Sequence, residues 1–235
     1  MRNFLKGNLI SLFLFLFMFL LANSSPVSAQ EKKWYFLAGG SVSVWSSDKW
    51  SDCSYVGDCV TSHSNARLEE FNSHVVGVGR LLEKFSLEMS YEDKTRTKWK
   101  ADRTVQTNGT IAQSAQANFE TKNIMLQLNK DLMSSEDINL YGLLGVGKSE
   151  HYNDTAFLVV SGTKVEYADP HTVDTVSYRV GMGLNSKIRD NLMLDGRFFY
   201  TDYGDAEVYD NVKNSVSYSV GMKSLDVGLY LRVLF

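Results

Sequence analysis

The chain has 235 residues, with 24 Lys and Arg against 27 Asp and Glu, and its formal net charge is −3. This mild acidity argues against a general nucleic-acid binder, whose binding domain carries a clear basic excess. The length suits a single domain.

Residues 1–29 have the form of a secretory signal peptide. Arg2 and Lys6 precede an apolar run of 14 residues at 9–22, and small residues follow. That run is short for a membrane-spanning helix, which needs about 20 residues. We therefore expect export, cleavage, and a mature chain of residues 30–235 whose charge falls from −3 to −5, because two cations are lost. That mature chain has no apolar run long enough for a transmembrane helix.

Eight segments of the mature chain alternate apolar and polar residues with the period of two that β-strands have. In chain order they are 34–45, 73–82, 85–92, 119–128, 138–149, 176–185, 192–201 and 224–235. Pro170 is the one proline among them and their connections, as expected where most backbone N–H groups join a hydrogen-bond ladder.

The connections between these segments alternate between short and long. Three are short, and the other four are the long loops 46–72, 93–118, 150–175 and 202–223. An outer-membrane barrel places its short turns on the periplasmic rim and its long loops on the outer rim. The sequence therefore predicts an all-β fold, an eight-stranded antiparallel up-and-down transmembrane β-barrel with both ends in the periplasm. A soluble β-sandwich is the alternative fold.

The polar face of these segments carries balanced charges. If the apolar face meets lipid, four basic and four acidic side chains face the interior: Arg80, Glu88, Glu92, Arg179, Asp195, Arg197, Asp226 and Arg232. The interior of an eight-stranded barrel is only wide enough to be filled by side chains, and buried charges need partners. The pattern predicts a salt-bridged plug. The phase of 138–149 stays open, because both of its faces are apolar.

The chain ends on the alternating segment LDVGLYLRVLF, in which Leu231, Val233 and Phe235 share one face. With the signal peptide and the glycine-rich strands WYFLAGG, YGLLGVG and YRVGMGLN, this segment resembles the eight-stranded outer-membrane β-barrel proteins of Gram-negative bacteria. That family includes the OmpA transmembrane domain and the OmpX/Ail-like and opacity-type proteins. The resemblance implies that these three residues belong to a signal read by the barrel-assembly machinery, and that outer-membrane lipids and lipopolysaccharide are partners.

The first long loop holds both cysteines of the chain. Cys53 and Cys59 are exported to an oxidising compartment, so we expect a disulfide between them. A zinc site that adds His63 is the alternative, and it lacks a clear fourth ligand.

Two other loops carry candidate binding features. Lys94, Arg96, Lys98 and Lys100, followed by Arg103, predict a basic ridge for phosphates of lipopolysaccharide or for acidic host polymers. The alternative is a solvated loop whose charges pair with their neighbours. Residues 156–168 hold two strand-like runs around Ser161 and Gly162, which predicts a protruding hairpin.

These features favour a surface protein with a structural or adhesion role carried by its loops. A narrow channel for small solutes is the alternative, and the balanced interior charge argues against it. A lipid-modifying enzyme is a remote alternative, because His63, His151 and His171 lie in long loops without an evident nucleophile and orienting acid. We expect no catalytic residue, cofactor or metal.

Overall fold

The computed structural model describes residues 34–47, 50–51, 62–64, 67–69, 72–105, 111–112, 114–135, 138–210 and 215–235. Residues 1–29, the predicted signal peptide, lie outside the described residues, as do Cys53 and Cys59. Within the described part of the chain, no helix is long and apolar enough to cross a membrane.

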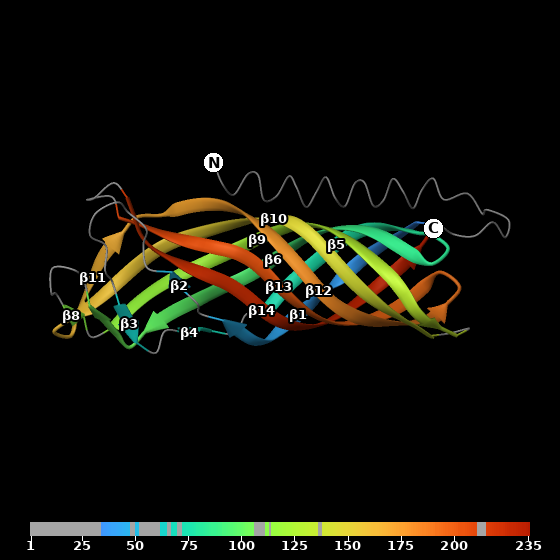
Figure 1. The fold of residues 1–235 in the computed structure, drawn as a ribbon, viewed down its shortest axis with the longest axis horizontal. Helices are drawn as coiled ribbons and strands as arrows, with labels where there is room; N and C mark the ends of the chain where they lie inside the picture. The colour runs from blue at the N-terminus through green and yellow to red at the C-terminus, as the bar shows by residue number, and fades with distance from the viewer. Residues whose placement is uncertain are drawn as a thin grey trace.

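Eight long strands form a closed antiparallel ring, as predicted (Figure 1). They are β1 (Trp34–Ser47), β5 (Asn72–Leu81), β6 (Phe85–Ala101), β9 (Ser114–Ser134), β10 (Ile138–Val160), β12 (His171–Arg189), β13 (Leu192–Asp210) and β14 (Ser215–Leu234). Each pairs with the next one in this order, and β14 pairs back with β1. All eight predicted strands are therefore present, which confirms the fold class.

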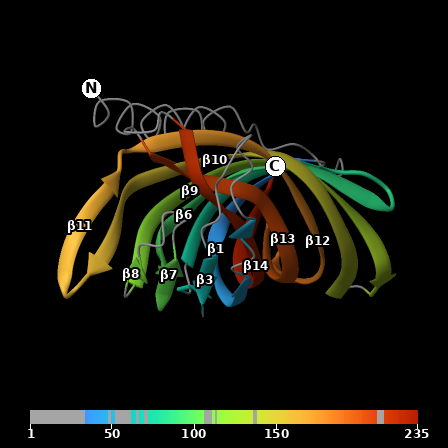
Figure 2. The ribbon, with the colours of Figure 1, turned by 60° about the vertical axis from the view of Figure 1, so that its left-hand side comes forward.

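Six short strands accompany the ring: β2 (Trp50–Ser51), β3 (Ser62–Ser64), β4 (Arg67–Leu68), β7 (Arg103–Val105), β8 (Ile111–Ala112) and β11 (Thr163–Ala168). β2, β4 and β11 pair with β14, β6 and β10, whereas β3, β7 and β8 form a small separate sheet. β10 and β11 form the predicted hairpin, which turns at Ser161 and Gly162 with φ of 50° and 80°. Figure 2 shows this hairpin swinging away from the ring.

The short turns and the C-terminus lie at the same end of the ring (Figure 1). There the N–H of Phe235 donates to the carbonyl of Trp34 at 2.9 Å, and the N–H of Trp34 donates back at 3.3 Å. The N–H of Leu234 donates to the carbonyl of Asn191 at 2.9 Å. The last strand thus closes the ring against the first, and its final residue is hydrogen-bonded to the start of the barrel.

At the other end the strands run much further than the sequence pattern predicts. A membrane-spanning β-strand needs about 9–11 residues, whereas β9 and β10 have 21 and 23. Much of the predicted loops 93–118, 150–175 and 202–223 is therefore strand. The barrel continues well past the length that a bilayer requires.

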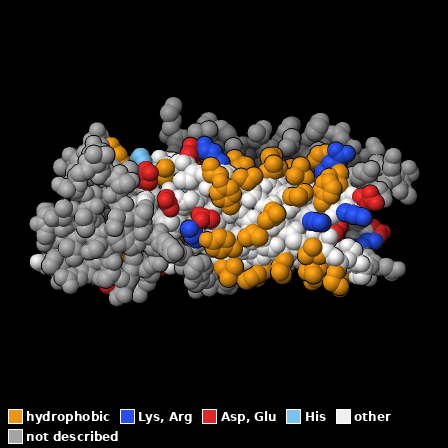
Figure 3. Space-filling model, viewed as in Figure 1, with side chains coloured by type: hydrophobic (Ala, Val, Ile, Leu, Met, Phe, Trp, Pro, Cys, Tyr) orange, Lys and Arg blue, Asp and Glu red, His pale blue; other side chains and the backbone are white. Residues whose placement is uncertain are grey.

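The polarity of the alternation reverses along the strands. Near the short turns, apolar side chains such as Met89 and Leu126 face outward and are about half exposed, while polar ones face inward. Further along, Trp99 and Phe119 face inward and are fully buried, while Lys98 faces outward. Figure 3 shows the outward apolar side chains as a band with charged side chains at both edges. The band suits lipid, and the part beyond it is a water-facing barrel with its own apolar core.

The reversal coincides with β-bulges, which insert an extra residue and shift which side chains face inward. On β6, Glu92 and Lys94 face inward before the bulge, and Thr97 and Trp99 face inward after it. Such irregularities lie at Ser43/Trp45, Lys94/Thr97, Asn153/Ala156 and Asp202/Asp205. The predicted strand 85–92 ended before its bulge because residues 93–98 are all polar, so no apolar face in the sequence marks the continuation of the strand.

We call the part from these bulges onward the outer extension; it comprises residues 97–105, 111–112, 114–119, 156–168, 203–210 and 215–222. Its interior is built largely from alanines packed around Trp99, Phe119 and Tyr203. These three rings are completely shielded from solvent.

Candidate functional site in the barrel interior

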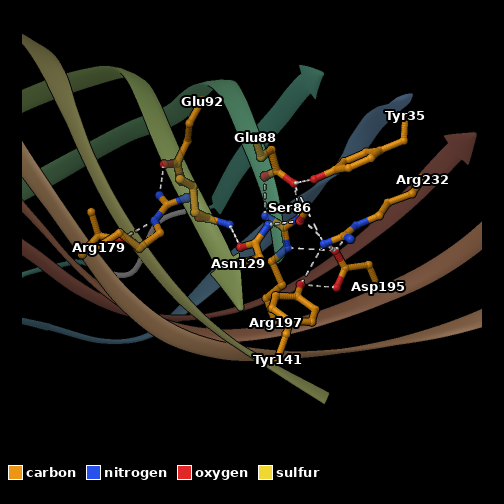
Figure 4. A network of polar contacts seen from close by, with 12 residues as sticks. Tyr35, Ser86, Glu88, Glu92, Asn129, Tyr141, Arg179, Asp195, Arg197 and Arg232 are labelled. Carbon is orange, nitrogen blue, oxygen red and sulfur yellow. Dashed lines mark hydrogen bonds and ion pairs between the residues drawn. The ribbon is translucent and has the colours of Figure 1, made fainter. Parts of the chain in front are cut away.

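A cluster of four charges fills the barrel interior on the side of the short turns (Figure 4). Arg197 on β13 forms a paired contact with Glu88 on β6, its Nη1 and Nη2 donating to the two carboxylate oxygens at 2.7 and 2.8 Å. Asp195 Oδ2 accepts from Arg197 Nε at 2.9 Å and from Arg232 Nε at 2.8 Å. All four side chains are buried, so each charge depends on these partners rather than on water.

Two buried tyrosines complete this cluster. The hydroxyl of Tyr35 donates to Glu88 Oε2 at 2.8 Å, and the hydroxyl of Tyr141 donates to Asp195 Oδ1 at 2.5 Å. Hydrogen bonds to ionised acceptors are among the stronger ones in proteins. The two carboxylates therefore hold the tyrosines in place as well as the arginines.

Inward-facing glycines make room for these two rings. Gly79 pairs with Tyr35 across β1 and β5, and Gly183 pairs with Tyr141 across β10 and β12. A Cβ atom at either glycine would lie 2.2 Å from the Cζ atom of the tyrosine ring. Gly183 belongs to YRVGMGLN, one of the glycine-rich strands that carried the family resemblance, and its packing reason is that the Tyr141 ring lies against backbone there.

A second cluster lies further toward the outer extension. Glu92 on β6 accepts a hydrogen bond from Arg179 on β12, and Lys94 Nζ lies 3.4 Å from Glu92 Oε1. The same Nζ lies 3.5 Å from Asp226 Oδ1 on β14 and 4.9 Å from the ring centre of Tyr203. These side chains are buried too, so a second layer of paired charge stands above the first.

The structure places seven of the eight predicted interior charges in these two clusters. The prediction for Arg80 is wrong: its side chain is exposed on the outer face of β5, with its guanidinium 5.4 Å from the ring centre of Trp34. Gly79 faces inward in its place because the Tyr35 ring needs that space. Lys94 takes the fourth interior cationic position, so the described clusters hold four cations and four anions: Lys94, Arg179, Arg197 and Arg232, with Glu88, Glu92, Asp195 and Asp226.

Lys94 is not part of the predicted basic ridge, because its side chain faces the barrel interior and is buried. Sequence reasoning placed Lys94 in a surface loop, but it shares the inward parity of Glu88 and Glu92 on β6, a signal that was available. Beyond the bulge, Arg96 pairs with Asp154 and Lys100 pairs with Glu69, while Lys98 is exposed. Arg103 lies in β7, and its side chain is outside what the structure describes.

The C-terminal residues of the predicted assembly signal face outward. Leu231 and Phe235 are exposed, and Val233 is half-buried. They belong to the lipid-facing band, so their side chains are accessible on the barrel surface beside the closing seam.

The two clusters share one kind of construction. In each cluster, opposite charges meet at hydrogen-bonding or ion-pair distance and aromatic rings fill the space between the strands. Among the described residues, no group of His, Cys, Asp and Glu side chains is arranged to hold a metal ion.

A model of the family described as "Outer membrane protein beta-barrel domain" matches residues 15–223. The chain belongs to this family. As an outer-membrane barrel it lies in the bacterial outer membrane, and barrels of this kind generally place their short turns in the periplasm.

The solved outer-membrane structures that are similar to this chain are distant from it in sequence. OprG from Pseudomonas aeruginosa aligns with a TM-score of 0.51 at 14% identity, over 88% of this chain and 97% of that one. The Escherichia coli outer membrane protease OmpT aligns with 0.48 at 11%, over 89% and 99%. Ail of Yersinia pestis, solved with the heparin analogue sucrose octasulfate, aligns with 0.38 at 14%, over 85% and 99%. No curated protein matches this chain.

His151 is a buried histidine of this outer-membrane barrel that lies beyond the lipid-facing band, where the neighbouring outward side chain is Glu150. Its Nδ1 lies 2.9 Å from Thr121 Oγ1, and its Nε2 lies 3.0 Å from Thr175 Oγ1 and 2.9 Å from the carbonyl of Tyr203. Burial lowers the pKa of His151 to about 4. The imidazole is therefore neutral at pH 7.

The lowered pKa of His151 predicts acid sensitivity. An unfolded histidine titrates near pH 6.5, so the stability present above that pH is lost as the pH falls toward 4, by about 2 kcal/mol at pH 5. We expect thermal unfolding in detergent to shift down between pH 7 and pH 5, and His151→Gln to remove most of that shift. The exposed His74→Gln is the control. Equal acid sensitivity in the wild type and His151→Gln would contradict this assignment.

Proposed function

We propose that this outer-membrane barrel is a non-conducting surface protein with a structural or adhesion role, whose external contacts are made by the outer extension. The main support is the length of that extension. The strands β9, β10, β12 and β13 have 19 to 23 residues, whereas a membrane span needs about 9–11. A barrel that only filled the membrane would not need strands of this length.

The outer extension is built as a rigid support. Its core rings Trp99, Phe119 and Tyr203 are completely buried, and inward alanines let the strands stay close around them. Burial of aromatic rings is a large stabilising contribution. The β10–β11 hairpin at the rim exposes Val165, and Lys164 Nζ lies 3.6 Å from the ring centre of Phe157. A firm support with an exposed hairpin suits contact with other surfaces.

The proposal includes partners at the membrane and beyond it. Lipopolysaccharide and acidic polymers are proposed to meet the outward cations Arg96, Lys98 and Lys100. Lys98 is exposed, whereas Arg96 and Lys100 contact the carboxylates of Asp154 and Glu69. The proposal assigns no catalytic activity and no solute transport. Cleavage after residue 29 and the Cys53–Cys59 disulfide stay predictions.

Removal of the hairpin tests the interaction role. Asn153 pairs with His171, so residues 154–170 can be replaced by a short turn that rejoins β10 to β12 at an existing pair. Bacteria carrying the intact barrel should bind host cells or matrix above the level of bacteria without it, and the shortened variant should lose most of that gain. Heat-modifiable migration on gels checks that both barrels fold.

The matched control keeps the hairpin and changes only its turn, Ser161→Asn, which retains a residue tolerant of positive φ before Gly162. It should bind as the intact protein does. Equal binding with and without the hairpin would contradict the assignment to the outer extension. No gain from the intact protein would contradict an interaction role altogether.

A further inference from the structure

A groove of about 880 Å³ crosses the outer face of the barrel. It follows a row of outward residues across six neighbouring strands, in which each residue is the cross-strand pairing partner of the next. From the short-turn side the row runs Leu140, Leu184, Gly196, Leu229, Gly40 and His74. The strands crossed are β10, β12, β13, β14, β1 and β5, which can be followed in Figure 1.

Two glycines hollow this row. Gly196 and Gly40 present no side chain to the outside, while Met182, Phe198 and Val227 rise beside them. The groove is therefore a trough with backbone as its floor and apolar side chains as its wall. The atoms that line such a trough lack van der Waals contacts on one side unless another molecule fills it.

The outer end of the groove is polar, unlike the rest of its course. His74 and Asn72 are exposed there. The next partners along the same row are charged, since His74 pairs with Asp93 and Asp93 pairs with Lys122. The row thus passes from the apolar band into the charged edge that faces the outside of the cell.

The length of the groove matches one lipid leaflet. Six strands spaced about 4.8 Å apart give a row about 24 Å long. Because barrel strands tilt by about 35–45°, a row perpendicular to them rises by about 15 Å through the membrane. This rise is about half of a hydrocarbon core about 30 Å thick, so the groove spans roughly the depth of one layer of acyl chains.

We propose that this groove seats an acyl chain of an outer-leaflet lipopolysaccharide, with the head group beside His74, Asn72 and Lys122. A trough that is apolar along its length and polar only at its outer end matches a lipid whose head lies at the outer surface. A second copy of the barrel fits less well, because a symmetric contact would place two concave faces against each other and leave the hollow unfilled. The inference rests on the outer-membrane location and is independent of the adhesion role.

Gly196→Leu is the variant that fills the groove. A Cβ atom at Gly196 has only the carbonyl oxygen of Leu184 within 4 Å, at 3.9 Å, so a side chain enters the trough without a clash. Gly40 is unsuitable, because a Cβ atom there would lie 2.6 Å from the carbonyl oxygen of Ser73. The change at Gly196 therefore alters the groove and leaves the backbone undisturbed.

Gly142→Leu is the matched control. Gly142 also faces outward in a membrane strand and has room for a side chain, with Leu132 Cδ1 at 3.7 Å as its nearest neighbour. It does not line the groove. The two variants add the same side chain to the same kind of surface, and they differ in whether the groove is filled.

The experiment loads the three purified barrels into nanodiscs of phosphatidylethanolamine with a fixed fraction of lipopolysaccharide, and native mass spectrometry counts the lipid retained. The wild type and Gly142→Leu should retain lipopolysaccharide. Gly196→Leu should retain about tenfold less, the effect of losing contact with about two buried CH₂ groups. Heat-modifiable migration on gels confirms that all three barrels are folded.

Three results would overturn the proposal. Equal retention by Gly196→Leu and Gly142→Leu would mean that the groove does not hold the chain. Retained phosphatidylethanolamine that falls in Gly196→Leu in place of lipopolysaccharide would assign the groove to a phospholipid. A dimer that Gly196→Leu alone abolishes would assign it to a second copy of the barrel.

Discussion

Replacement of Glu88 by Gln is expected to destabilise the folded barrel by about 3–5 kcal/mol, the effect of removing one partner from a buried ion pair. Glu88 accepts two hydrogen bonds from Arg197 and one from Tyr35, and Arg232 Nη2 lies 4.0 Å from it. Without its charge, Asp195 is the one carboxylate left in that cluster for two buried arginines. The midpoint of urea unfolding in detergent measures the loss.

A matched control and a double variant separate charge from shape. Glu150→Gln changes a half-exposed carboxylate 3.8 Å from Lys122 on the outer face, where such pairs contribute under about 1 kcal/mol. Glu88→Gln with Arg197→Gln restores charge balance, so the double variant should be less destabilised than the sum of the two single changes. Additive losses, or a loss at Glu88 no larger than at Glu150, would contradict a coupled charge cluster.

Removal of the last two residues is expected to cause the second large loss. Deleting Leu234 and Phe235 removes both backbone hydrogen bonds to Trp34 and the one to Asn191. The β1–β14 seam then loses its Tyr35–Leu234 pair but keeps the pairs from Phe36–Val233 to Ser47–Lys223, so only its short-turn end frays. We expect a barrel that still shifts on heating but unfolds at a clearly lower urea concentration in detergent, because three backbone hydrogen bonds are lost.

Phe235→Ala separates closure of the ring from recognition in the cell. This variant keeps the backbone bonds of residue 235 and removes only the outward ring, so refolding in detergent should stay near the wild type. If Leu231, Val233 and Phe235 form an assembly signal, the amount of folded barrel in cell membranes should fall. Unchanged assembly of Phe235→Ala in cells would remove the ring from that signal.

The membrane-spanning part of this fold was predictable from sequence because apolar and polar residues alternate there without interruption. The apolar residues face lipid and the polar ones face the barrel interior. The strand starts at Trp34, Phe85, Ile138 and Leu192 match the predicted segments, whereas β9 and β12 end at Ser134 and Arg189, past the predicted ends at 128 and 185. Interior charges followed from parity alone wherever a strand carried a clear apolar face. The prediction was wrong for Arg80, because the ring of Tyr35 on the neighbouring strand β1 determines which side of β5 faces inward.

The outer extension could not be derived from the same pattern. A bulge shifts which side chains face inward, so the same alternation in the sequence places apolar residues outside before the bulge and inside after it. Trp99 and Lys98 alternate as regularly as Met89 and Glu88, but with opposite orientation. The packing of Tyr141 over Gly183 depends on the register between the neighbouring strands β10 and β12, which local alternation does not encode.

Single-channel recording in planar lipid bilayers tests the central claim, that paired charges and aromatic rings close the barrel interior. The purified wild-type barrel, shown by gel mobility to be inserted and folded, should give no conductance steps above the bare bilayer. Reproducible steps from the folded barrel, absent from a boiled sample of the same preparation, would show a continuous wet path past Glu88, Arg197 and Arg232 and would contradict the closed interior.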